Sequence, residues 1–427
     1  MKPITRHAPR HRRLRNTLLA AAAMAFVPAA LAQQPPLKVG LMLPATGTFA
    51  SLGNSITNGF KQYVAENGGK LGDRTIEYYT VDDESDPAKA TENANKLIKR
   101  DKVDVLVGTV HSGVAMAMAK AARENNTLMI VPNAGADELT GPLCAPNIFR
   151  VSYSNWQTAY PMGKVAAEKG HKKVVTLAWK YAAGLQAVNG FKEAFEKGGG
   201  TIAKEMTLPF PNVEFQPFLA EIASLKPDAV FVFFAGAGAT KFVKDYVASG
   251  LNKSIPLYSS GFLTEGNLDA MGEAGQGLFT TLHYADGLKG ARNDVFRSTC
   301  AKTDKSQPDA YAVQGYDSAQ LLGAGLKAVK GDTTRRDNAF VEIATKGLAD
   351  PARGCKMQDR LNKSRRHRPL PMKNSLKLPS FREFFMGNAS YMWENRLQRW
   401  LKPDLKCMLD PVEICYFTVL LCGDKQC

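Results

Sequence analysis

The side chains best suited to binding chemistry lie in one loop, GTVHSG at residues 108–113. Thr109 and Ser112 supply hydroxyl groups, and His111 supplies an imidazole. The alanine- and methionine-rich segment 114–125 that follows has the pattern of a helix, and serine is a preferred residue at a helix N-cap. The first backbone N–H groups of a helix have no partner within it, and the helix dipole is positive there. We therefore predict a small-anion site at this helix start, with Ser112 at the cap.

A second loop, NAGAD at residues 133–137, faces the first one in the predicted fold. Residues 103–107 and 128–131 are short, β-branched and bounded by turn residues, as strands buried in parallel sheets are. With the helix between them they form a βαβ unit. Neighbouring parallel strands end at the same edge of the sheet, where open α/β sheets bind ligands. The residues predicted to complete half of the site are therefore Asn133, Ala134 and Gly135.

Each residue of the first loop has a second interpretation. Ser112 is a plain helix cap if no ligand reaches it. His111 is either a ligand donor or a neutral histidine beside the cap. A hydrolase built on His111, Ser112 and one of Asp82, Asp83 or Asp137 is disfavoured, because a histidine rarely reaches the hydroxyl of its sequence neighbour and no oxyanion loop is present. We therefore expect a binding protein and not an enzyme.

Other chemical motifs are weak. The acidic run 82–86 is interpreted as a solvated strand-end loop, with Asp86 near a helix start, and not as a metal site. Residues 236–238 (GAG) lack the third glycine and the acidic residue of a dinucleotide fingerprint. No C-x-x-C pair or Cys/His cluster indicates zinc. We expect neither a metal nor a cofactor.

Strand and helix patterns alternate along most of the chain. The predicted strands are 37–43, 76–81, 103–107, 128–131, 173–178, 229–234, 256–259 and 277–282. The predicted helices are 53–66, 87–100, 114–125, 156–169, 185–197, 215–225, 240–250, 296–302 and 311–330. Such alternation produces doubly wound parallel sheets, and 427 residues exceed one ordinary domain. We predict an α/β protein with two doubly wound parallel-sheet lobes joined by a hinge, in which 311–330 returns to cover the first lobe.

The two ends of the chain differ from this core. Residues 1–32 hold six basic residues, an apolar run and the cleavage-site pattern Ala30-Leu31-Ala32, which together indicate a signal peptide and export to a bacterial periplasm. No membrane span is expected after cleavage. From residue 358 the alternation stops, although residues 412–421 could form a strand. We interpret 358–427 as a basic tail that is foreign to the fold or disordered.

Charge and cysteine content follow the same division. The net charge is +15, of which residues 1–32 and 358–427 carry +6 each, so residues 33–357 carry +3. This nearly neutral core gives no indication of nucleic-acid binding. Three cysteines, Cys144, Cys300 and Cys355, lie in the core, and an oxidising compartment permits a disulfide among them without fixing the pair.

Several stretches resemble the type I periplasmic solute-binding proteins of ABC transporters, in the branched-chain amino-acid and amide-binding group. They are KVGLMLPATGTFASLGNSITNGFKQYV, VDDESDPAKATENANKLIKRDKVDVLVGTVHSGVAMAMAKAA, PNAGADELTG, NIFRVSYSNWQ and YAVQGYDSAQLL, which span about residues 37–335. VGTVHSGVA and NAGAD are most similar to the aromatic-carboxylate branch. The resemblance implies a ligand held between two hinged lobes. It places lobe 1 at 33–152, lobe 2 at 153–284, a return to lobe 1 at 285–341 and a family-like end at 342–357.

The resemblance also assigns site residues. It places the carboxylate-binding turn on Thr109, His111 and Ser112, and the facing loop on Asn133, Ala134 and Gly135. From lobe 2 it adds Tyr181, Phe234, Gly236, Phe262 and Leu263, although Phe234 ends an apolar strand and is equally well interpreted as a core residue. Phe262 and Leu263 stand where amino-acid binders place an acidic group, with Glu265 two residues on. This departure favours a carboxylate with an apolar or aromatic body.

The function implied is capture of a small carboxylate and its delivery to an ABC permease. A ligand-sensing module for a membrane partner is the alternative within the binding class. The family continues after residue 330 with further second-lobe strands, whereas this chain passes almost at once from Val341 into ATKGLADPARGCKM, which resembles the family's terminal residues, and then into the unmatched tail. We therefore expect an internal loss near Val341, which would leave the second lobe without its edge strands.

Overall fold

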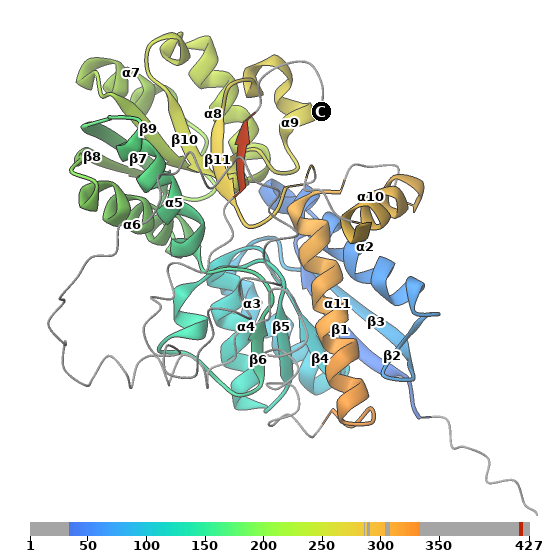
Figure 1. Ribbon diagram of the computed structural model, residues 1–427. Helices are drawn as coiled ribbons and strands as arrows, with labels where there is room; N and C mark the ends of the chain where they lie inside the picture. Colours follow the sequence, from blue (N-terminus) through green and yellow to red (C-terminus); the bar gives the residue numbers. More distant parts are fainter. Residues whose placement is uncertain (1–33, 286, 288–290, 304–307, 334–417, 422–427) are drawn as a thin grey trace, which may run out of the picture. The chain divides into compact units, whose positions relative to one another are not determined.

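The computed structural model describes residues 34–285, 287, 291–303, 308–333 and 418–421. Within these residues the strands form two sheets, each part of an α/β lobe (Figure 1). The first sheet has the order β2-β3-β1-β4-β5-β6 and the second has the order β12-β11-β10-β9-β7-β8. All pairs of neighbouring strands are parallel except β2 with β3 and β11 with β12. The predicted α/β fold class is confirmed.

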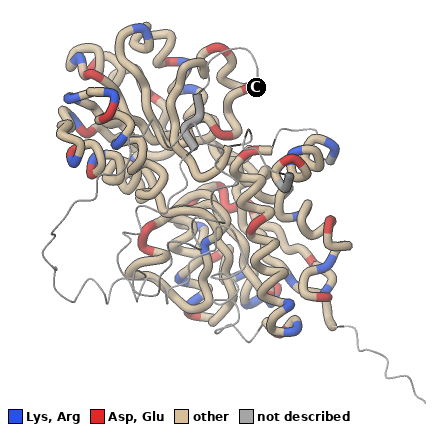
Figure 2. Tube along the Cα trace, viewed as in Figure 1, with Lys and Arg blue, Asp and Glu red and all other residues tan. Residues whose placement is uncertain are grey.

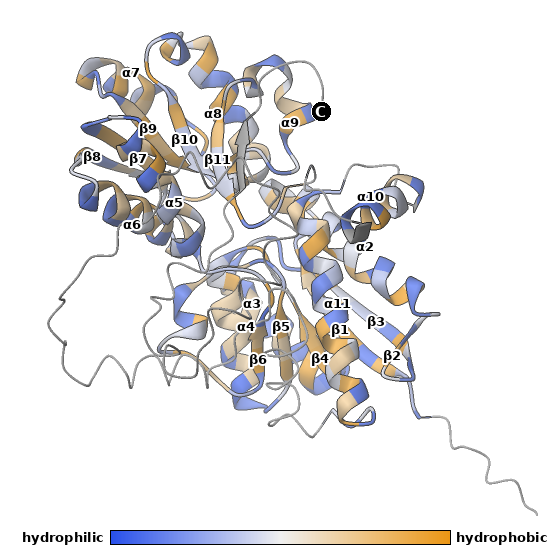
Figure 3. Ribbon diagram, in the orientation of Figure 1, coloured by the Kyte–Doolittle hydropathy of each residue, from blue (hydrophilic) through white to orange (hydrophobic). Residues whose placement is uncertain are grey.

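The first lobe contains the predicted βαβ unit. Its strands are β1 (Leu37–Leu43), β2 (Lys70–Leu71), β3 (Arg74–Asp82), β4 (Val105–Val107), β5 (Leu128–Val131) and β6 (Ile148–Arg150). Its helices are α2 (Ala50–Glu66), α3 (Pro87–Asn95), α4 (Ser112–Glu124) and α11 (Ala310–Ala328), with the π-helical turn η3 (Lys96–Arg100) after α3 and the 3-10 turns η2 (Gly47–Phe49) and η4 (Asp137–Thr140). The central strands are almost wholly buried, and β4 and β5 contain only apolar residues (Figure 3).

Helix α11 packs in the core of the first lobe although it lies far along the chain. Its residues Leu321, Leu322 and Leu326 join a hydrophobic cluster with the first-lobe strands. The helix lies beside α2 (Figure 1), and a Cβ atom at Gly59 would be 1.9 Å from the carbonyl oxygen of Ala312. Only glycine permits backbones to approach so closely. This packing brings the start of α11 to the end of the sheet that carries the candidate site.

The second lobe repeats the same architecture. Its strands are β7 (Lys173–Trp179), β8 (Thr201–Leu208), β9 (Ala229–Phe233), β10 (Leu257–Ser260) and β11 (Phe279–Leu282). Its helices are α5 (Asn155–Glu168), α6 (Ala182–Lys197), α7 (Gln216–Leu225), α8 (Gly236–Ala248) and α9 (Leu268–Met271); α10 (Ala291–Thr303) precedes α11. The three 3-10 turns are η5 (Leu251–Lys253), η6 (Gly261–Leu263) and η7 (Gly272–Gly275). Strand β8 was not predicted, because its residues are mostly exposed and polar.

Four residues of the basic tail form a strand that joins the second sheet. Strand β12 (Thr418–Leu421) pairs antiparallel with β11, so that Phe279 lies opposite Leu421 (Figure 1). The edge of β11 that we expected to be unpaired is therefore covered. The strand predicted over 412–421 is present at 418–421, and the expected loss near Val341 lies outside the described residues.

The cysteines and the charges complete the description. Cys144 is disulfide-bonded, and the buried Cys300 thiol donates a hydrogen bond to Gln62 Oε1 at 3.0 Å. Figure 2 shows Lys and Arg positions interspersed with Asp and Glu positions along the outer helices and loops. In the described part of the chain, no helix is both long and apolar enough to cross a membrane, and no cluster of His, Cys, Asp and Glu has the arrangement of a metal site.

Candidate functional site

His111, and not Ser112, caps helix α4. The imidazole Nδ1 accepts hydrogen bonds from the backbone N–H groups of Gly113, at 3.1 Å, and Val114, at 3.4 Å. This finding corrects the predicted cap, because a histidine side chain in the extended N-cap conformation reaches the amides that a serine hydroxyl would have bound. It also means that two of the amides we expected to hold an anion already have a partner.

The His111 imidazole has a fixed protonation state. Burial lowers its pKa to about 4, so the ring is neutral at physiological pH. Because Nδ1 accepts hydrogen bonds, the single ring proton must be on Nε2. The side chain that caps the helix thus offers one N–H donor on its other side.

The His111 ring belongs to an aromatic stack, which we define as His111, Tyr181 and Phe210. Tyr181 lies parallel to the imidazole, with ring centroids 4.4 Å apart at 14°, and Phe210 contacts both rings at 4.9 and 5.4 Å. Tyr181 stands at the start of α6 and Phe210 in the loop after β8, so the second lobe supplies both. The structure therefore brings the predicted Tyr181 to the predicted His111.

A hydrogen bond joins Thr109, in the loop before α4, to Asp83, in the loop after β3. The Thr109 hydroxyl donates to the Asp83 carboxylate, and the Thr109 carbonyl accepts from the N–H of Ala134 at 2.9 Å. Asp83 is fully buried, which contradicts the interpretation of residues 82–86 as a wholly solvated loop. Burial raises the pKa of Asp83 to about 6. Asp86 caps α3 by accepting from the N–H of Ala88, as its position before the helix predicted.

Ser112 lies in a set of hydrogen bonds that we call the polar bridge, formed by Ser112, Asn155, Gln186, Asp137 and Glu138. Asn155 Nδ2 donates to Ser112 Oγ at 3.2 Å and to Gln186 Oε1 at 2.7 Å. Gln186 Oε1 also accepts from the N–H of Asp137 at 3.2 Å, and its Nε2 donates to Glu138 at 2.8 Å. Because Ser112 accepts from Asn155, its own hydroxyl proton can be donated elsewhere.

The facing loop is packed against its surroundings. Asn133 Nδ2 donates to the Tyr153 hydroxyl at 2.6 Å and to Gln314 Oε1 at 2.8 Å. A Cβ atom at Gly135 would lie 2.4 Å from Asn155 Oδ1, so only glycine fits there. The predicted loop residues thus lie beside Thr109 and Ser112, where they position Tyr153 and Asn155.

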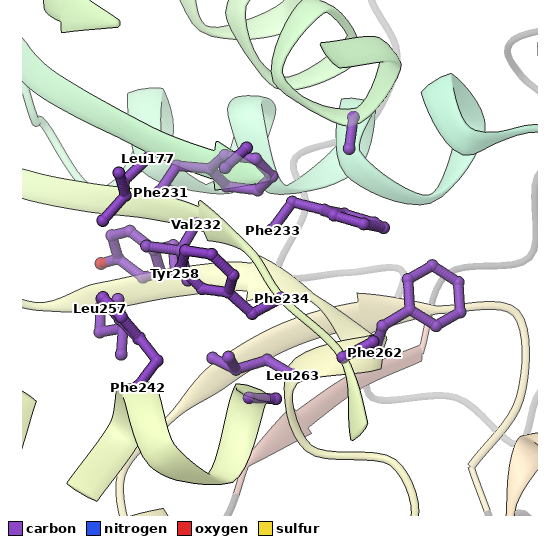
Figure 4. Close-up of a cluster of buried hydrophobic side chains, with 14 of the residues drawn as sticks. Leu177, Phe231, Val232, Phe233, Phe234, Phe242, Leu257, Tyr258, Phe262 and Leu263 are labelled. Carbon is purple, nitrogen blue, oxygen red and sulfur yellow. The ribbon is translucent and has the colours of Figure 1, made fainter. Parts of the chain in front are cut away.

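Of the predicted second-lobe residues, Phe234 and Leu263 are core residues, whereas Gly236 contacts η2 and Phe262 contacts Tyr153. Phe234 is wholly buried among Trp179, Phe215 and Phe242, and so is a core residue (Figure 4). Leu263 is also wholly buried in that core. Gly236 lies at the first-lobe turn η2, where a Cβ atom would be 2.2 Å from the Thr48 carbonyl oxygen.

Phe262 points toward other aromatic residues. It contacts Tyr153 at 5.0 Å and Phe233 at 5.9 Å, and in Figure 4 the rings of Phe233 and Phe262 point away from the packed group around Phe231 and Phe234. Phe233 in turn contacts Tyr181 at 6.3 Å. These rings extend the aromatic stack toward the start of α11.

Sequence reasoning missed Phe210, Phe233 and the polar partners Asn155 and Gln186. The alternation of side chains along β9 could have indicated that Phe233 and Phe234 point to opposite sides of the sheet. Phe210 lies directly before Pro211 in a loop, a position that gave no signal. Asn155, at the start of α5, and Gln186, within α6, are ordinary polar residues, and only their packing gives them a role.

The arrangement described so far is that of a two-lobed solute-binding fold, with polar loops at the strand ends of one lobe against aromatic residues of the other. Residues 36–347 match the family model described as Periplasmic binding protein. Leu/Ile/Val-binding protein homolog 6 of Brucella melitensis is 32% identical over 341 residues, which cover 78% of this chain and 86% of that protein. The chain belongs to the family of type I periplasmic binding proteins.

Two solved structures indicate the branch of the family. An ABC-transporter solute-binding protein of R. palustris in complex with benzoate is 53% identical, with a TM-score of 0.72 over 74% of this chain and 88% of that chain. A solute-binding protein of Rhodopseudomonas palustris BisB5 in complex with 3,4-dihydroxybenzoic acid is 35% identical, with a TM-score of 0.67 over 70% and 82%. The predicted resemblance, including its aromatic-carboxylate branch, is confirmed.

Proposed function

We propose that this protein is the solute-binding component of an ABC uptake system for a small aromatic carboxylate. The observation that carries the proposal is the stack of His111 on Tyr181, with ring centroids 4.4 Å apart, which joins the polar helix start of one lobe to an aromatic residue of the other. Similarity to the benzoate complex at 53% identity supports the same ligand class.

The proposed site divides the ligand into two parts. The carboxylate accepts hydrogen bonds from His111 Nε2–H and from the Ser112 hydroxyl, two donors that remain after the contacts described above. The aromatic body packs on Tyr181, Phe233 and Phe262, where ring contacts and loss of water provide affinity. Hydrogen bonds to a charged carboxylate are stronger than those between neutral groups, so the acid group fixes the orientation.

Closing of the lobes on the ligand would couple binding to recognition by the permease. We propose that residues 1–32 are a signal peptide and that the mature protein works in the periplasm. We further propose that lobe 1 spans residues 33–152, that lobe 2 spans residues 153–284 and that residues 285–341 return to lobe 1.

Mass spectrometry of the exported protein should find Gln33 at its N-terminus. Membrane vesicles that contain the permease should take up ligand only when the protein is added.

A branched-chain amino acid is the second candidate ligand. Relatives in Brucella carry the name Leu/Ile/Val-binding protein, and a buried Asp137 Oδ1 has no hydrogen-bond partner among the described residues. Against this candidate, Glu265 accepts from the N–H of Ala310 at 3.0 Å, and Asp309 accepts from Ala312 and Ser55. Both carboxylates near Phe262 thus already serve to hold the start of α11.

Calorimetry on ligand-stripped protein separates the two candidates. We expect benzoate or a substituted benzoate to bind and to raise the unfolding midpoint, because a ligand selective for the folded state stabilises it. Leucine should do neither. Ser112→Ala should weaken carboxylate binding while the protein remains folded. Tight leucine binding without any response to benzoates would overturn the proposal.

A further inference from the structure

Among the buried polar atoms that have no hydrogen-bond partner in the described residues, two belong to residues whose rings contact Tyr153 or Phe262. They are the hydroxyl of Tyr311 and Nδ1 of His283. Buried polar groups in folded proteins are nearly always paired, and leaving one unpaired destabilises the protein. Each such atom therefore needs an explanation, and a bound ligand is one.

His283 lies directly after β11, at the carboxyl end of the strand. Its Nε2 is 3.5 Å from Gln314 Nε2, and its ring lies 5.1 Å from that of Tyr153. An amide nitrogen can only donate, so Nε2 accepts in this contact and the ring proton is on Nδ1. Burial lowers the pKa of His283 to about 4, which keeps the ring neutral. The unpaired atom is thus an N–H donor.

Tyr311 approaches the same place from the first lobe. It is completely buried in the first turn of α11, one turn before Gln314, and its ring lies 6.5 Å from that of Phe262. Burial, and then charge on Tyr153, raises the pKa of Tyr311, which is consistent with the two phenols being neighbours. Its hydroxyl can both donate and accept.

A continuous series of ring contacts connects these two atoms to the carboxylate-binding end. The series runs through Tyr181, Phe233, Phe262 and Tyr153, with successive centroids 6.3, 5.9 and 5.0 Å apart. His111 contacts the first ring of this series and His283 the last. The site thus has polar groups at both ends and an aromatic middle.

We propose that His283 and Tyr311 form a second polar subsite, which binds an oxygen substituent on the aromatic ring of the ligand. The preferred ligand is then a ring-hydroxylated benzoate. His283 Nδ1–H donates to the substituent oxygen, and the Tyr311 hydroxyl completes its hydrogen bonding. The inference rests on the proposed function, since it concerns the far end of the same ligand.

The test compares pairs of ligands of equal size. Calorimetry should measure 3- and 4-hydroxybenzoate against 3- and 4-methylbenzoate, with benzoate as reference. A site built to bind an oxygen rejects a methyl group that leaves its polar atoms unpaired. We expect at least one hydroxy acid to bind about tenfold or more tightly than its methyl counterpart. Equal affinities within both pairs would overturn the subsite, while failure of every benzoate to bind would overturn the proposed function instead.

Two matched tyrosine variants assign the effect to a residue. Tyr311→Phe removes only the unpaired hydroxyl and should reduce the hydroxy-to-methyl affinity ratio toward one. Tyr246→Phe is the control, because the Tyr246 hydroxyl donates to the Ile255 carbonyl at 2.9 Å inside the second lobe. It should preserve the ratio. A ratio that Tyr311→Phe and His283→Phe both leave unchanged would mean that water satisfies these atoms, and the subsite would be wrong.

Discussion

At the scale of single residues, His111 combines three interactions that sequence analysis would assign to different side chains. It caps α4, it stacks on Tyr181, and its Nε2–H is the donor that we propose binds the ligand carboxylate. The cap depends on Nδ1 and the ligand contact on Nε2, so the two can be separated by substitution. The stack depends on the planar ring alone.

Two substitutions of His111 should therefore differ. His111→Phe keeps a ring against Tyr181 but loses the cap, which should lower the free energy of unfolding by about 1 kcal/mol. His111→Asn restores a capping oxygen and should be more stable than the phenylalanine variant. Both should bind benzoates more weakly, since each removes Nε2–H. Urea unfolding and calorimetry measure the two effects, and undiminished affinity in either variant would exclude His111 as a carboxylate donor.

The depressed pKa of His111 predicts a dependence on pH. The folded-state pKa of about 4 lies below the ordinary value of 6.5, so the unfolded chain binds more protons between these values. The wild type therefore loses stability through this group as pH falls from 6.5 to 4. His111→Phe has no such loss, and its deficit relative to wild type should shrink between pH 7 and pH 4.5.

Asp83 provides a control of opposite sign. Burial raises its pKa from 3.8 to about 6 in the folded state, so its contribution to stability is present at low pH and lost as pH rises through 6. Asp83→Asn should gain stability relative to wild type over that rise. A stability difference that is constant with pH in both variants would contradict the assigned protonation states.

At the scale of elements, the start of α8 approaches the turn η2 of the first lobe through Gly236. This residue has φ +55°, and a Cβ atom there would be 2.2 Å from the Thr48 carbonyl oxygen. Gly250 also has a positive φ, +76°, but no atom lies within 4 Å of its Cβ position. Substitution of the two glycines therefore distinguishes the effect of a positive φ alone from the effect of a positive φ combined with close packing.

Alanine substitutions at these glycines should have unequal effects. Gly250→Ala should cost about 1 kcal/mol, the ordinary penalty for a left-handed residue with a Cβ atom. Gly236→Ala should cost more and should also weaken ligand binding, since it displaces η2 and the adjacent Phe49. Denaturant unfolding and calorimetry provide the comparison, and equal effects on both measurements would show that the close approach is unimportant.

The polar bridge links helix α6 to the loop 137–138. Gln186→Ala removes three hydrogen bonds, two of which join α6 to the loop 137–138 while the third joins it to Asn155 of α5, so it should raise the Kd of the ligand about three- to tenfold. Lys192→Ala on the same helix is the control, because its exposed ion pair with Glu205 lies within the second lobe. Calorimetry that finds equal Kd values for both variants would exclude a role of the bridge in binding.

At the scale of the whole molecule, the second sheet ends in a strand from the C-terminal tail. Residues Thr418–Leu421 cover the outer edge of β11, and an uncovered edge strand exposes unpaired backbone groups. Truncation after residue 357 should therefore speed amide hydrogen exchange in Phe279–Leu282 and lower the unfolding midpoint. Strand β6 of the other sheet is the internal control. Unchanged exchange in β11 after truncation would mean that the tail strand adds no protection.

The local pattern of this sequence was enough to predict most of its helices and strands and the two loops at the strand ends, but not strands β2, β6 and β8. Apolar runs such as 37–43 and 128–131 fold as strands because burial on both faces requires uniform hydrophobicity, and the helices between them follow from spacing. The position of Thr109, Ser112 and Asn133 at one sheet edge then follows from parallel pairing alone. Edge strand β8 was missed because an exposed strand need not be apolar.

The tertiary structure alone decided which side chains meet at the site. His111 contacts Tyr181 and Phe210, Asp83 lies buried against Thr109, and His283 lies near Gln314, although these partners are separated by 26 to 99 positions in the chain. Such contacts depend on how two sheets and their loops pack, which no local pattern records. A buried, unpaired or neutralised group acquires its chemistry from that packing, because burial sets its pKa and its need for a partner.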